Sequence, residues 1–375
     1  MTGCAVLSHR RSRTLISVHH KFLSVFICDK KAVVLDKTKL HKEEQKMKIR
    51  KLVIVALAIG MLAVALVGPS VAAQPFRIAI VMPSARTDMA FSQSMWDALL
   101  AVQKEMGGES ALKIAYSEDM FKVPDAAAAI RDYASQGFNI VLAHGSQYGS
   151  SVQEIAKDFP KTTFAWGTHV DTFGMANVFA YTAAAEQGGY VNGVLAARVT
   201  KSKVIGVTGP VEVGDAKTYI SGFTQGVASV DPSIRVAKTW TGSFSDVALM
   251  AEAAKTHIAA NADVLTGSSQ SVVGSIGAAK AAKSKVLWFG TQQNQAPLAP
   301  DLVVASQQYD WRGVLKDIIK NNKAGKLGGQ AYVAELKNAG LRIVYNPGFK
   351  LPDAAKKAGD KATADITSGA VKIKP

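Results

Sequence analysis

The sequence predicts a two-lobed α/β protein in which each lobe contains a doubly wound parallel sheet. Short apolar, β-rich runs alternate with longer helical patterns from Phe76 to Ser306, which is typical of repeated βαβ units. There are about ten such strands, more than one open sheet holds comfortably. The length of 375 residues, 48% of them hydrophobic, is sufficient for two domains with a core each.

The expected elements follow from the spacing of apolar residues along the chain. Runs rich in β-branched and aromatic residues predict strands at Arg77–Met82, Leu112–Tyr116, Ile140–His144, Thr163–Trp166, Val178–Tyr181, Val204–Val207, Val236–Trp240, Val264–Thr266, Val286–Phe289, Leu302–Ser306 and 342–345. Helical spacing predicts helices at Ser92–Met106, Asp125–Gln136, Ala184–Arg198, Lys217–Val230, Val247–Ala260, Ser271–Lys280, Trp311–Lys320 and Asp353–Thr367.

Three crossings between the lobes are expected where a strand leads into an element of the other lobe. They are placed near Ala180–Glu186, Ser306–Asp310 and Gly325–Gln330. The chain then divides into an N-terminal lobe of residues 74–181 plus 306–330 and a C-terminal lobe of residues 182–305 plus 331–375.

The segment 47–73 has the three-part order of a secretory signal peptide. A basic patch, Met47–Lys51, precedes an apolar run of sixteen residues, Leu52–Val67, and small residues at 71–73 follow a Gly-Pro-Ser break. The run is shorter than the ~20 residues that a membrane-spanning helix needs. We expect cleavage near Ala73 and Met47 as the true start, with residues 1–46 an upstream misreading or a disposable leader. A genuine extended leader is the alternative.

Removal of residues 1–73 would leave 31 Lys and Arg against 25 Asp and Glu, dispersed rather than clustered. Nucleic-acid binding needs a basic stripe with a reading element, and neither is present. Both cysteines lie before residue 47, so no disulfide or thiolate metal site is expected in the folded part. No cysteine stands at the signal junction, which predicts an unlipidated periplasmic protein, and we expect a monomer without cofactor or metal.

Ligands of open parallel sheets bind beyond the carboxyl ends of the strands. The residues that follow the predicted strands are rich in aromatic rings and amides: Phe91, Tyr148, Trp166, Phe244, Gln270, Gln292, Gln293 and Asn294. Such side chains suit a flat heteroaromatic ligand, stacked on its faces and hydrogen-bonded at its edges. Alternatively, these aromatic residues close the core at the ends of the lobes.

Catalytic motifs are missing from the sequence after residue 73. There is no G-x-S-x-G elbow, P-loop or G-x-G-x-x-G, and the histidines 144, 169 and 257 share no metal-ligand spacing. Asp88 and Asp246 could form an acid/base pair across a cleft, or accept hydrogen bonds from a ligand. Without a nucleophile or cofactor, a binding protein is favoured over an enzyme.

Several ordered motifs resemble the basic membrane protein (purine nucleoside receptor-like) family of ABC transporter substrate-binding proteins. The similar segments are Asp88–Leu99, Glu186–Ala197, Ser221–Gly226, Gly242–Asp246 and Gly290–Gln295. The resemblance implies a type I periplasmic-binding fold with hinge crossovers and, as partner, an inner-membrane ABC permease. The implied ligand is a purine-type base or nucleoside.

The resemblance also implies roles for individual residues. Phe91 and Phe244 would sandwich the base, with Asp88 and Ser92 at its polar edge. Gly145–Tyr148 and Trp166 would line one lobe, and Asp246 would orient the facing lobe or hold the closed state. Gln270, Gln292, Gln293 and Asp310 complete the expected binding site.

Two departures from the family pattern concern the ligand. Gln292 stands where nucleoside binders carry an aspartate suited to ribose hydroxyls, and the stretch 307–311, which includes Asp310, lacks the family lysine. An amide offers one acceptor and one donor group, whereas a carboxylate accepts two hydroxyl bonds. A free purine base or another heterocycle is therefore an alternative to a ribonucleoside. A sugar, a vitamin or another metabolite, and a secreted α/β hydrolase, are the remaining alternatives.

Overall fold

The computed structural model describes residues 37–65 and 74–375, which belong to two separate compact units, 1–72 and 73–375. Helix α1 (Lys37–Ala65) covers the basic patch and most of the predicted apolar run. The predicted leader up to residue 36 and the cleavage site near Ala73 lie outside the described residues. Among the described helices, none combines the length and apolar character that crossing a membrane requires.

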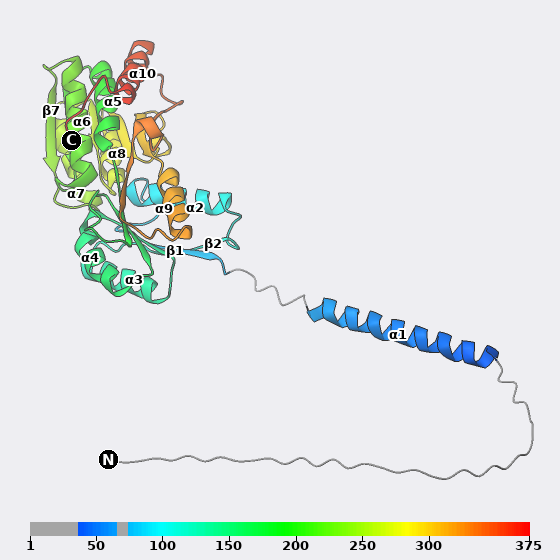
Figure 1. Ribbon diagram of the computed structural model, residues 1–375. Helices are drawn as coiled ribbons and strands as arrows, with labels where there is room; N and C mark the ends of the chain where they lie inside the picture. The colour runs from blue at the N-terminus through cyan, green and yellow to red at the C-terminus, as the bar shows by residue number, and fades with distance from the viewer. Residues whose placement is uncertain (1–36, 66–73) are drawn as a thin grey trace, which may run out of the picture. The chain divides into compact units, whose positions relative to one another are not determined.

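The first sheet of the folded unit is parallel throughout, with the strand order β11-β5-β4-β3-β1-β2. Figure 1 labels its strands β1 and β2. Its strands are β1 (Phe76–Val81), β2 (Leu112–Ser117), β3 (Ile140–His144), β4 (Thr163–Gly167), β5 (Val178–Ala183) and β11 (Gln330–Ala334). The helices of this lobe are α2 (Phe91–Glu105), α3 (Val123–Ser135), α4 (Gly149–Asp158) and α9 (Arg312–Lys323). All residues of β3 and β4 are buried, as expected for strands covered on both faces.

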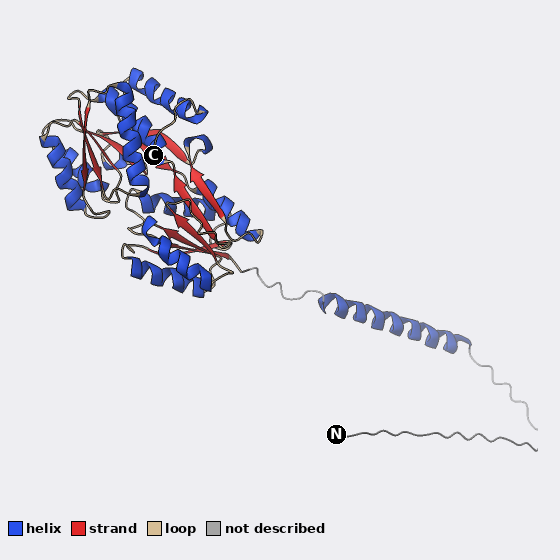
Figure 2. Cartoon of the chain, turned by 60° about the vertical axis from the view of Figure 1, so that its left-hand side comes forward, coloured by secondary structure: helices blue, strands red, loops and turns tan. Residues whose placement is uncertain are grey.

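The second sheet has the order β12-β10-β9-β8-β6-β7, and only β10 and β12 pair antiparallel among its described strands. Its strands are β6 (Val204–Gly209), β7 (Arg235–Trp240), β8 (Val264–Gly267), β9 (Leu287–Gln292), β10 (Val303–Tyr309) and β12 (Leu341–Tyr345). Its helices are α5 (Ala185–Val199), α6 (Gly214–Val230), α7 (Val247–Ala259), α8 (Val272–Ala281) and α10 (Asp353–Ser368). Short 3₁₀ turns are η1 (Ser146–Tyr148), η2 (Ala296–Leu298) and η3 (Leu336–Asn338). Figure 2 shows both sheets with helices packed around them.

The expected α/β class with two doubly wound sheets is confirmed, and each expected strand and helix has a counterpart. Helix α4 and strand β11 were not expected. The crossings fall at 183–185, 309–312 and 334–341. The third differs from the expected 325–330, because 330–334 forms β11 and pairs with β5 in the first sheet. Residues 306–309 likewise stay in the second sheet, where β10 pairs with β9 and β12.

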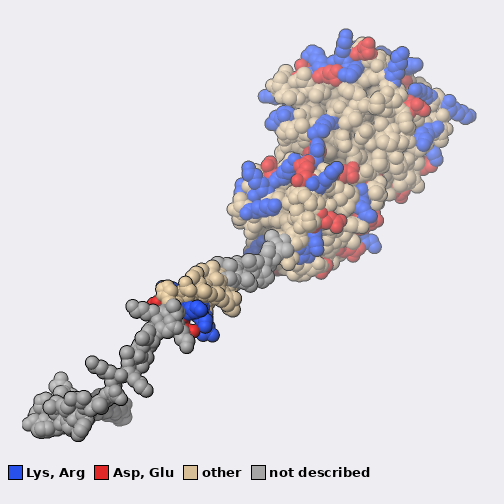
Figure 3. All heavy atoms as spheres, turned by 90° about the vertical axis from the view of Figure 1, so that its right-hand side faces the viewer, with Lys and Arg blue, Asp and Glu red and all other residues tan. Residues whose placement is uncertain are grey.

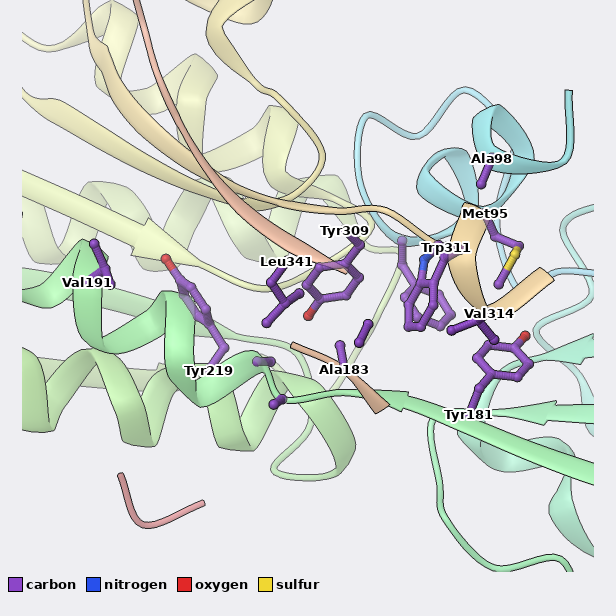
Figure 4. Packing of buried hydrophobic residues seen from close by; sticks show 14 of the residues in the cluster. Met95, Ala98, Tyr181, Ala183, Val191, Tyr219, Tyr309, Trp311, Val314 and Leu341 are labelled. Carbon is purple, nitrogen blue, oxygen red and sulfur yellow. The ribbon is translucent and has the colours of Figure 1, made fainter. Parts of the chain in front are cut away.

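A continuous hydrophobic core runs through the crossings between the lobes. Trp311, at the start of α9, is fully buried and packs edge-on against Tyr181 and Tyr309, with ring centroids 5.3 and 5.4 Å away (Figure 4). Its indole N–H donates to the hydroxyl of Ser94 at 3.0 Å. The lobes therefore share an aromatic anchor at the place about which they would move.

The glycine motifs of the second lobe serve helix packing rather than ligand contact. Gly189 and Gly193 of α5 face the backbone of α6, and Gly222 and Gly226 of α6 face the backbone of α5. A Cβ atom at any of the four would collide with backbone oxygens of the facing helix. Glycine at these positions lets the two helices approach closely.

Candidate functional site

A pocket lies between the carboxyl ends of the strands of the two sheets. The first lobe lines it with Pro83, Phe91, Gly145, Ser146, Gln147 and Thr168, and the second with Asp215, Ala216, Phe244, Ser268, Gln270 and Gln292. The chain order of the strands reverses between β1 and β3 in one sheet and between β6 and β8 in the other. Loops after these strands contribute to the lining, so the pocket occupies the switch point of both sheets.

Phe91, the first residue of α2, lines the pocket from the first lobe and is backed by a second aromatic layer. Its ring stacks on the imidazole of His144, with centroids 3.8 Å apart and planes at 5°. His144 is fully buried, with its Nδ1 2.8 Å from the hydroxyl of Tyr181 and its Nε2 3.2 Å from the carbonyl oxygen of Phe91. Burial lowers the pKa of His144 to about 3, which keeps the ring neutral at physiological pH.

Phe244, in the loop after β7, lines the pocket from the second lobe and is only partly buried. Its carbonyl oxygen accepts hydrogen bonds from the hydroxyls of Ser269 (2.9 Å) and Ser271 (3.2 Å), which fix the loop. Its ring lies 6.1 Å from that of Phe121, an exposed residue of the first lobe. Phe121 and Phe244 thus make an aromatic contact between the lobes beside the pocket.

Gln292, the last residue of β9, is buried and has its backbone in the left-handed region, with φ 71°. Its amide nitrogen donates to the Asp215 carboxylate and to the Ser268 hydroxyl, both at 3.3 Å. Its carbonyl oxygen is buried and has no hydrogen-bond partner among the described residues. A non-glycine residue held at positive φ is uncommon and is found preferentially at functional sites.

Asp215 lies in the first turn of α6, behind Gln292. Its Oδ2 also accepts a hydrogen bond from the hydroxyl of Tyr309 at 2.9 Å. Burial raises the pKa of Asp215, while the bonds from Tyr309, Gln292 and the helix backbone act in the opposite direction. Burial, followed by the charge of Asp215, raises the pKa of Tyr309 well above its ordinary value, so this phenol remains a donor.

Gln270 follows β8, the neighbour of β9 in the sheet, and lines the same side of the pocket. Its carbonyl oxygen is also buried and, within the described part of the chain, unpartnered. An orphaned buried acceptor costs free energy, so these two amide oxygens beside one pocket are places where a donor from water or from a ligand would be stabilising.

A family model described as "ABC transporter substrate-binding protein PnrA-like" matches residues 76–373 of this chain. The chain belongs to this family. The resemblance stated from the motifs is thereby confirmed, and the members of this class bind a small ligand and work with a permease, typically outside the cytoplasm.

The similarity to known members covers most of the folded unit. A protein of Brucella abortus named as a purine-binding protein is 28% identical over 68% of this chain and 71% of its own length. The ABC transporter nucleoside-binding protein BmpA of Lactococcus lactis is 28% identical over 76% of this chain and 85% of its own. A solute-binding protein structure from Conexibacter woesei superposes with a TM-score of 0.63, at 20% identity, over 80% and 98% of the chains.

Of the residues expected to bind ligand, the structure of this PnrA-like protein brings five together in the pocket. These are Phe91, Gly145, Phe244, Gln270 and Gln292. The other seven lie elsewhere, and each has a partner within the protein.

Tyr148 and Trp166 are core residues of the first lobe rather than lining residues. Tyr148 is fully buried and donates its hydroxyl to the carbonyl of Met120 at 2.7 Å. Trp166 packs under Gly149, which has no side chain to obstruct it, and donates its indole N–H to the carbonyl of Gly145 at 3.1 Å. The alternative stated for aromatic residues, closure of the core at the lobe end, applies to these two.

Asp88 and Ser92 organise the start of α2. Asp88 accepts hydrogen bonds from the backbone N–H groups of Ala90, Ser92 and Gln93 and from the hydroxyl of Ser84, at 2.8–3.1 Å. The Ser92 hydroxyl lies 2.6 Å from that of Ser84 and is buried. Asp88 therefore caps the helix that carries Phe91, and its role in the site is to position that ring.

Asp246, Gln293 and Asp310 also lie outside the pocket. Asp246 is exposed and caps α7 through the backbone N–H of Leu249 at 3.0 Å. Gln293 donates to the Asp97 carboxylate across the lobes at 2.8 Å. Asp310 forms ion pairs with Arg312 and Arg342 at the junction of the lobes.

Asp215, Ser268, Thr168 and Phe121 were missed by the sequence prediction. Ser268 and Thr168 closely follow the predicted strands 264–266 and 163–166, but serine and threonine there carry no distinctive signal. Phe121 lies five residues beyond the predicted strand 112–116. Asp215 lies eight residues beyond the predicted strand 204–207, in the first helical turn, where an acidic residue is common for reasons unrelated to ligands.

The described residues contain no group of three or more His, Cys, Asp or Glu that could hold a metal ion. The lining residues described for the pocket include one carboxylate, Asp215, and its Oδ2 is already engaged by Tyr309 and Gln292. What this arrangement offers is two ring faces, amide groups and serine hydroxyls.

Proposed function

We propose that this PnrA-like protein is the secreted receptor of an ABC importer and binds a purine-type base or nucleoside between its lobes. The observation that supports this most is the pair Phe91 and Phe244, one from each lobe, on the lining of one pocket that also contains two amide oxygens without a partner among the described residues. Two ring faces suit a flat ligand, and amides can recognise its edge.

Closure of the lobes would complete the site. Gln293 reaches Asp97 across the lobes, and Gln295 donates to the carbonyl of Met89 at 3.2 Å. These bonds would act as a latch when the ligand draws the lobes together, with movement at the three crossings. The closed form would then deliver the ligand to the permease, and reopening would release it.

The proposed location is the periplasm, reached through the signal at 47–73, with cleavage near Ala73, no lipid and a monomeric state. Basic and acidic side chains are interspersed over the face seen in Figure 3, without a continuous basic stripe on that face. Such a surface suits a freely diffusing receptor rather than a nucleic-acid-binding protein.

Binding without chemistry is the proposed activity. The lining residues described above include no histidine, cysteine or lysine that could act as a nucleophile or base. The buried imidazole of His144 is covered by Phe91 and engaged at both nitrogens. The ligand is therefore expected to leave unchanged.

Thermal unfolding with a ligand panel tests the proposal. Protein produced from the full-length gene is heated with hypoxanthine, adenine, inosine and guanosine, and with glucose, ribose and thiamine as comparisons. At about 100 times its Kd, a ligand that binds only the folded form adds ~2.7 kcal/mol of stability and raises Tm. A purine compound should raise Tm and be recovered intact by chromatography. No shift with any purine compound, or conversion of one, contradicts the proposal.

A further inference from the structure

The amide of Gln292 has a fixed orientation in the cleft. Its nitrogen is committed to two acceptors of the protein, the Asp215 carboxylate and the Ser268 hydroxyl. An ionised carboxylate only accepts hydrogen bonds, so rotating the amide by 180° would set its oxygen against Asp215. The side-chain carbonyl oxygen of Gln292 is therefore the atom left without a partner in the described part of the chain.

Asp215 is held in this accepting role by its surroundings. The Tyr309 hydroxyl donates to the same Oδ2 atom, and backbone N–H groups at the start of α6 bond to the carboxylate as well. Each of these partners is a donor and favours the ionised form, against the burial that raises the pKa of Asp215. Asp215 thus determines which end of the Gln292 amide meets a ligand.

Gln270 differs from Gln292 because no protein group fixes its amide. No hydrogen bond from its side chain to another described residue is present, and its carbonyl oxygen is buried. It can turn either its nitrogen or its oxygen to a ligand. The strands that precede Gln270 and Gln292 are neighbours in the sheet, so one ligand edge can meet both amides.

We infer that the cleft selects an uncharged heterocycle that directs a lactam edge, a ring N–H beside a carbonyl, to Gln292 and Gln270, with Asp215 as the residue that positions Gln292. This inference rests on the proposed function and specifies its ligand class. The ring N–H meets the fixed oxygen of Gln292, and the adjacent carbonyl accepts from the adaptable amide of Gln270. In the same ring orientation, an aminopurine edge has the reverse order, a ring acceptor beside an amino donor, and leaves the oxygen of Gln292 facing a lone pair; to avoid this, the aminopurine must turn its ring over in the cleft.

The test is calorimetric titration of the protein purified from the full-length gene with hypoxanthine, 1-methylhypoxanthine and adenine. Methylation at N1 removes the ring N–H and leaves a buried acceptor unpaired, which should weaken binding about tenfold to a hundredfold. Adenine should be weaker than hypoxanthine by a similar factor. If all three bind within about threefold of one another, the inference is overturned while the proposed function stands. If none of the three and no purine nucleoside binds, the proposed function fails.

Asp215→Asn tests the positioning role. The amide of the substituted residue can donate to the side-chain oxygen of Gln292, so that the Gln292 amide rotates and turns its nitrogen to the ligand. The ratio of hypoxanthine to adenine affinity should therefore fall to near one or reverse. Asp263→Asn is the matched control, because Asp263 also accepts several hydrogen bonds but lies just before β8, at the amino ends of the strands and away from the pocket. The ratio of hypoxanthine to adenine affinity in this control should match that of the wild-type protein. An unchanged ratio in well-folded Asp215→Asn overturns the positioning role.

Gln292→Met gives a second test that does not depend on the folding of Asp215→Asn. Methionine has a similar volume and lacks the carbonyl acceptor, so the penalty for N1 methylation should shrink to about threefold or less. Ser268→Ala removes the other acceptor of the Gln292 amide nitrogen and should reduce the hypoxanthine preference partially. A full methylation penalty in Gln292→Met overturns the assignment of Gln292 as the acceptor.

Discussion

Among the described residues that line the pocket, the buried side-chain atoms without a hydrogen-bond partner are two amide oxygens of the second lobe. Asp88, Tyr148 and Trp166 are engaged within the first lobe, and Phe91 rests on His144. Gln270 and Gln292 face the pocket with free acceptors. Under the proposed function this difference implies a division of labour, in which the first lobe offers the apolar ring of Phe91 as a platform and the second reads the ligand's edge.

The largest expected difference between the two sides concerns their aromatic rings. Phe91 is 4% exposed and belongs to the main core, so Phe91→Ala should lower the free energy of unfolding by about 3–5 kcal/mol as well as weaken binding. Phe244 is partly exposed, so Phe244→Ala should cost about 1 kcal/mol of stability and weaken purine binding about tenfold to a hundredfold. Chemical denaturation and calorimetric titration of both variants measure these effects. Equal losses of stability in Phe91→Ala and Phe244→Ala would contradict the distinction between a core ring in the first lobe and a partly exposed ring in the second.

The pH dependence of stability tests the buried His144, on which the ring of Phe91 stacks. The pKa of His144 is about 3 in the folded protein, below its ordinary value of about 6.5, because burial disfavours the charged ring. The unfolded chain therefore takes up the proton first as the pH falls. This contribution is fully present above about pH 6.5 and is lost between pH 6.5 and 3.

At pH 5 the loss attributable to His144 should be about 2 kcal/mol. Denaturation curves of wild type and His144→Gln at pH 7.5 and 5 measure it, and the variant should lack most of the acid-induced loss. A smaller dependence should persist, because burial also lowers the pKa of His257. If both proteins lose the same stability between these pH values, His144 is not held neutral as described.

The two aspartate caps give a smaller contrast between the lobes. Asp88 accepts four hydrogen bonds at the start of α2, so Asp88→Ala should cost about 2 kcal/mol of unfolding free energy or slightly more. Asp246 is exposed and accepts one bond at the start of α7, so Asp246→Ala should cost about 0.5–1 kcal/mol. Urea denaturation of the two variants compares them. A larger loss of unfolding free energy in Asp246→Ala than in Asp88→Ala would contradict this ranking of the two caps.

The latch between the lobes should have the smallest effect. Gln293→Ala removes the bond to Asp97 without touching the pocket lining, and should weaken ligand binding about threefold through a less stable closed form. Gln136→Ala, an exposed glutamine of the first lobe, is the control. Identical Kd values for the two variants would show that this contact does not support closure.

A side chain could be located from the sequence when the end of a predicted strand was enough to fix its position. Phe91, Phe244, Gln270 and Gln292 were predicted to line the cleft because they follow apolar runs whose ends are visible in the sequence, and in parallel sheets these ends share one edge. Their assignment to a ligand stays a prediction. Strand β11 was not predicted, because it is a short edge strand whose residues are mostly half-buried and lack a strong apolar pattern.

The residues that lie outside the pocket despite the prediction, and those that the prediction missed, depend on contacts between distant segments. Trp166 follows a strand as Phe91 does, but it packs beneath the backbone of Gly149, a contact that no local pattern encodes. Asp215 resembles any acidic residue in a first helical turn until Gln292 and Tyr309 are brought beside it by β9 and β10. Tertiary contacts of this kind decide whether a polar side chain caps a helix or reads a ligand.

A crystal structure of the protein with hypoxanthine tests the central claim most directly. The ring should lie between Phe91 and Phe244, with N1 within hydrogen-bond distance of the Gln292 carbonyl oxygen and the exocyclic carbonyl oxygen of the lactam facing Gln270. Asp215 should keep its contact with the Gln292 amide nitrogen. A ring bound elsewhere, or in this cleft with its lactam edge towards the first lobe, would contradict the division between an apolar platform and a polar reader.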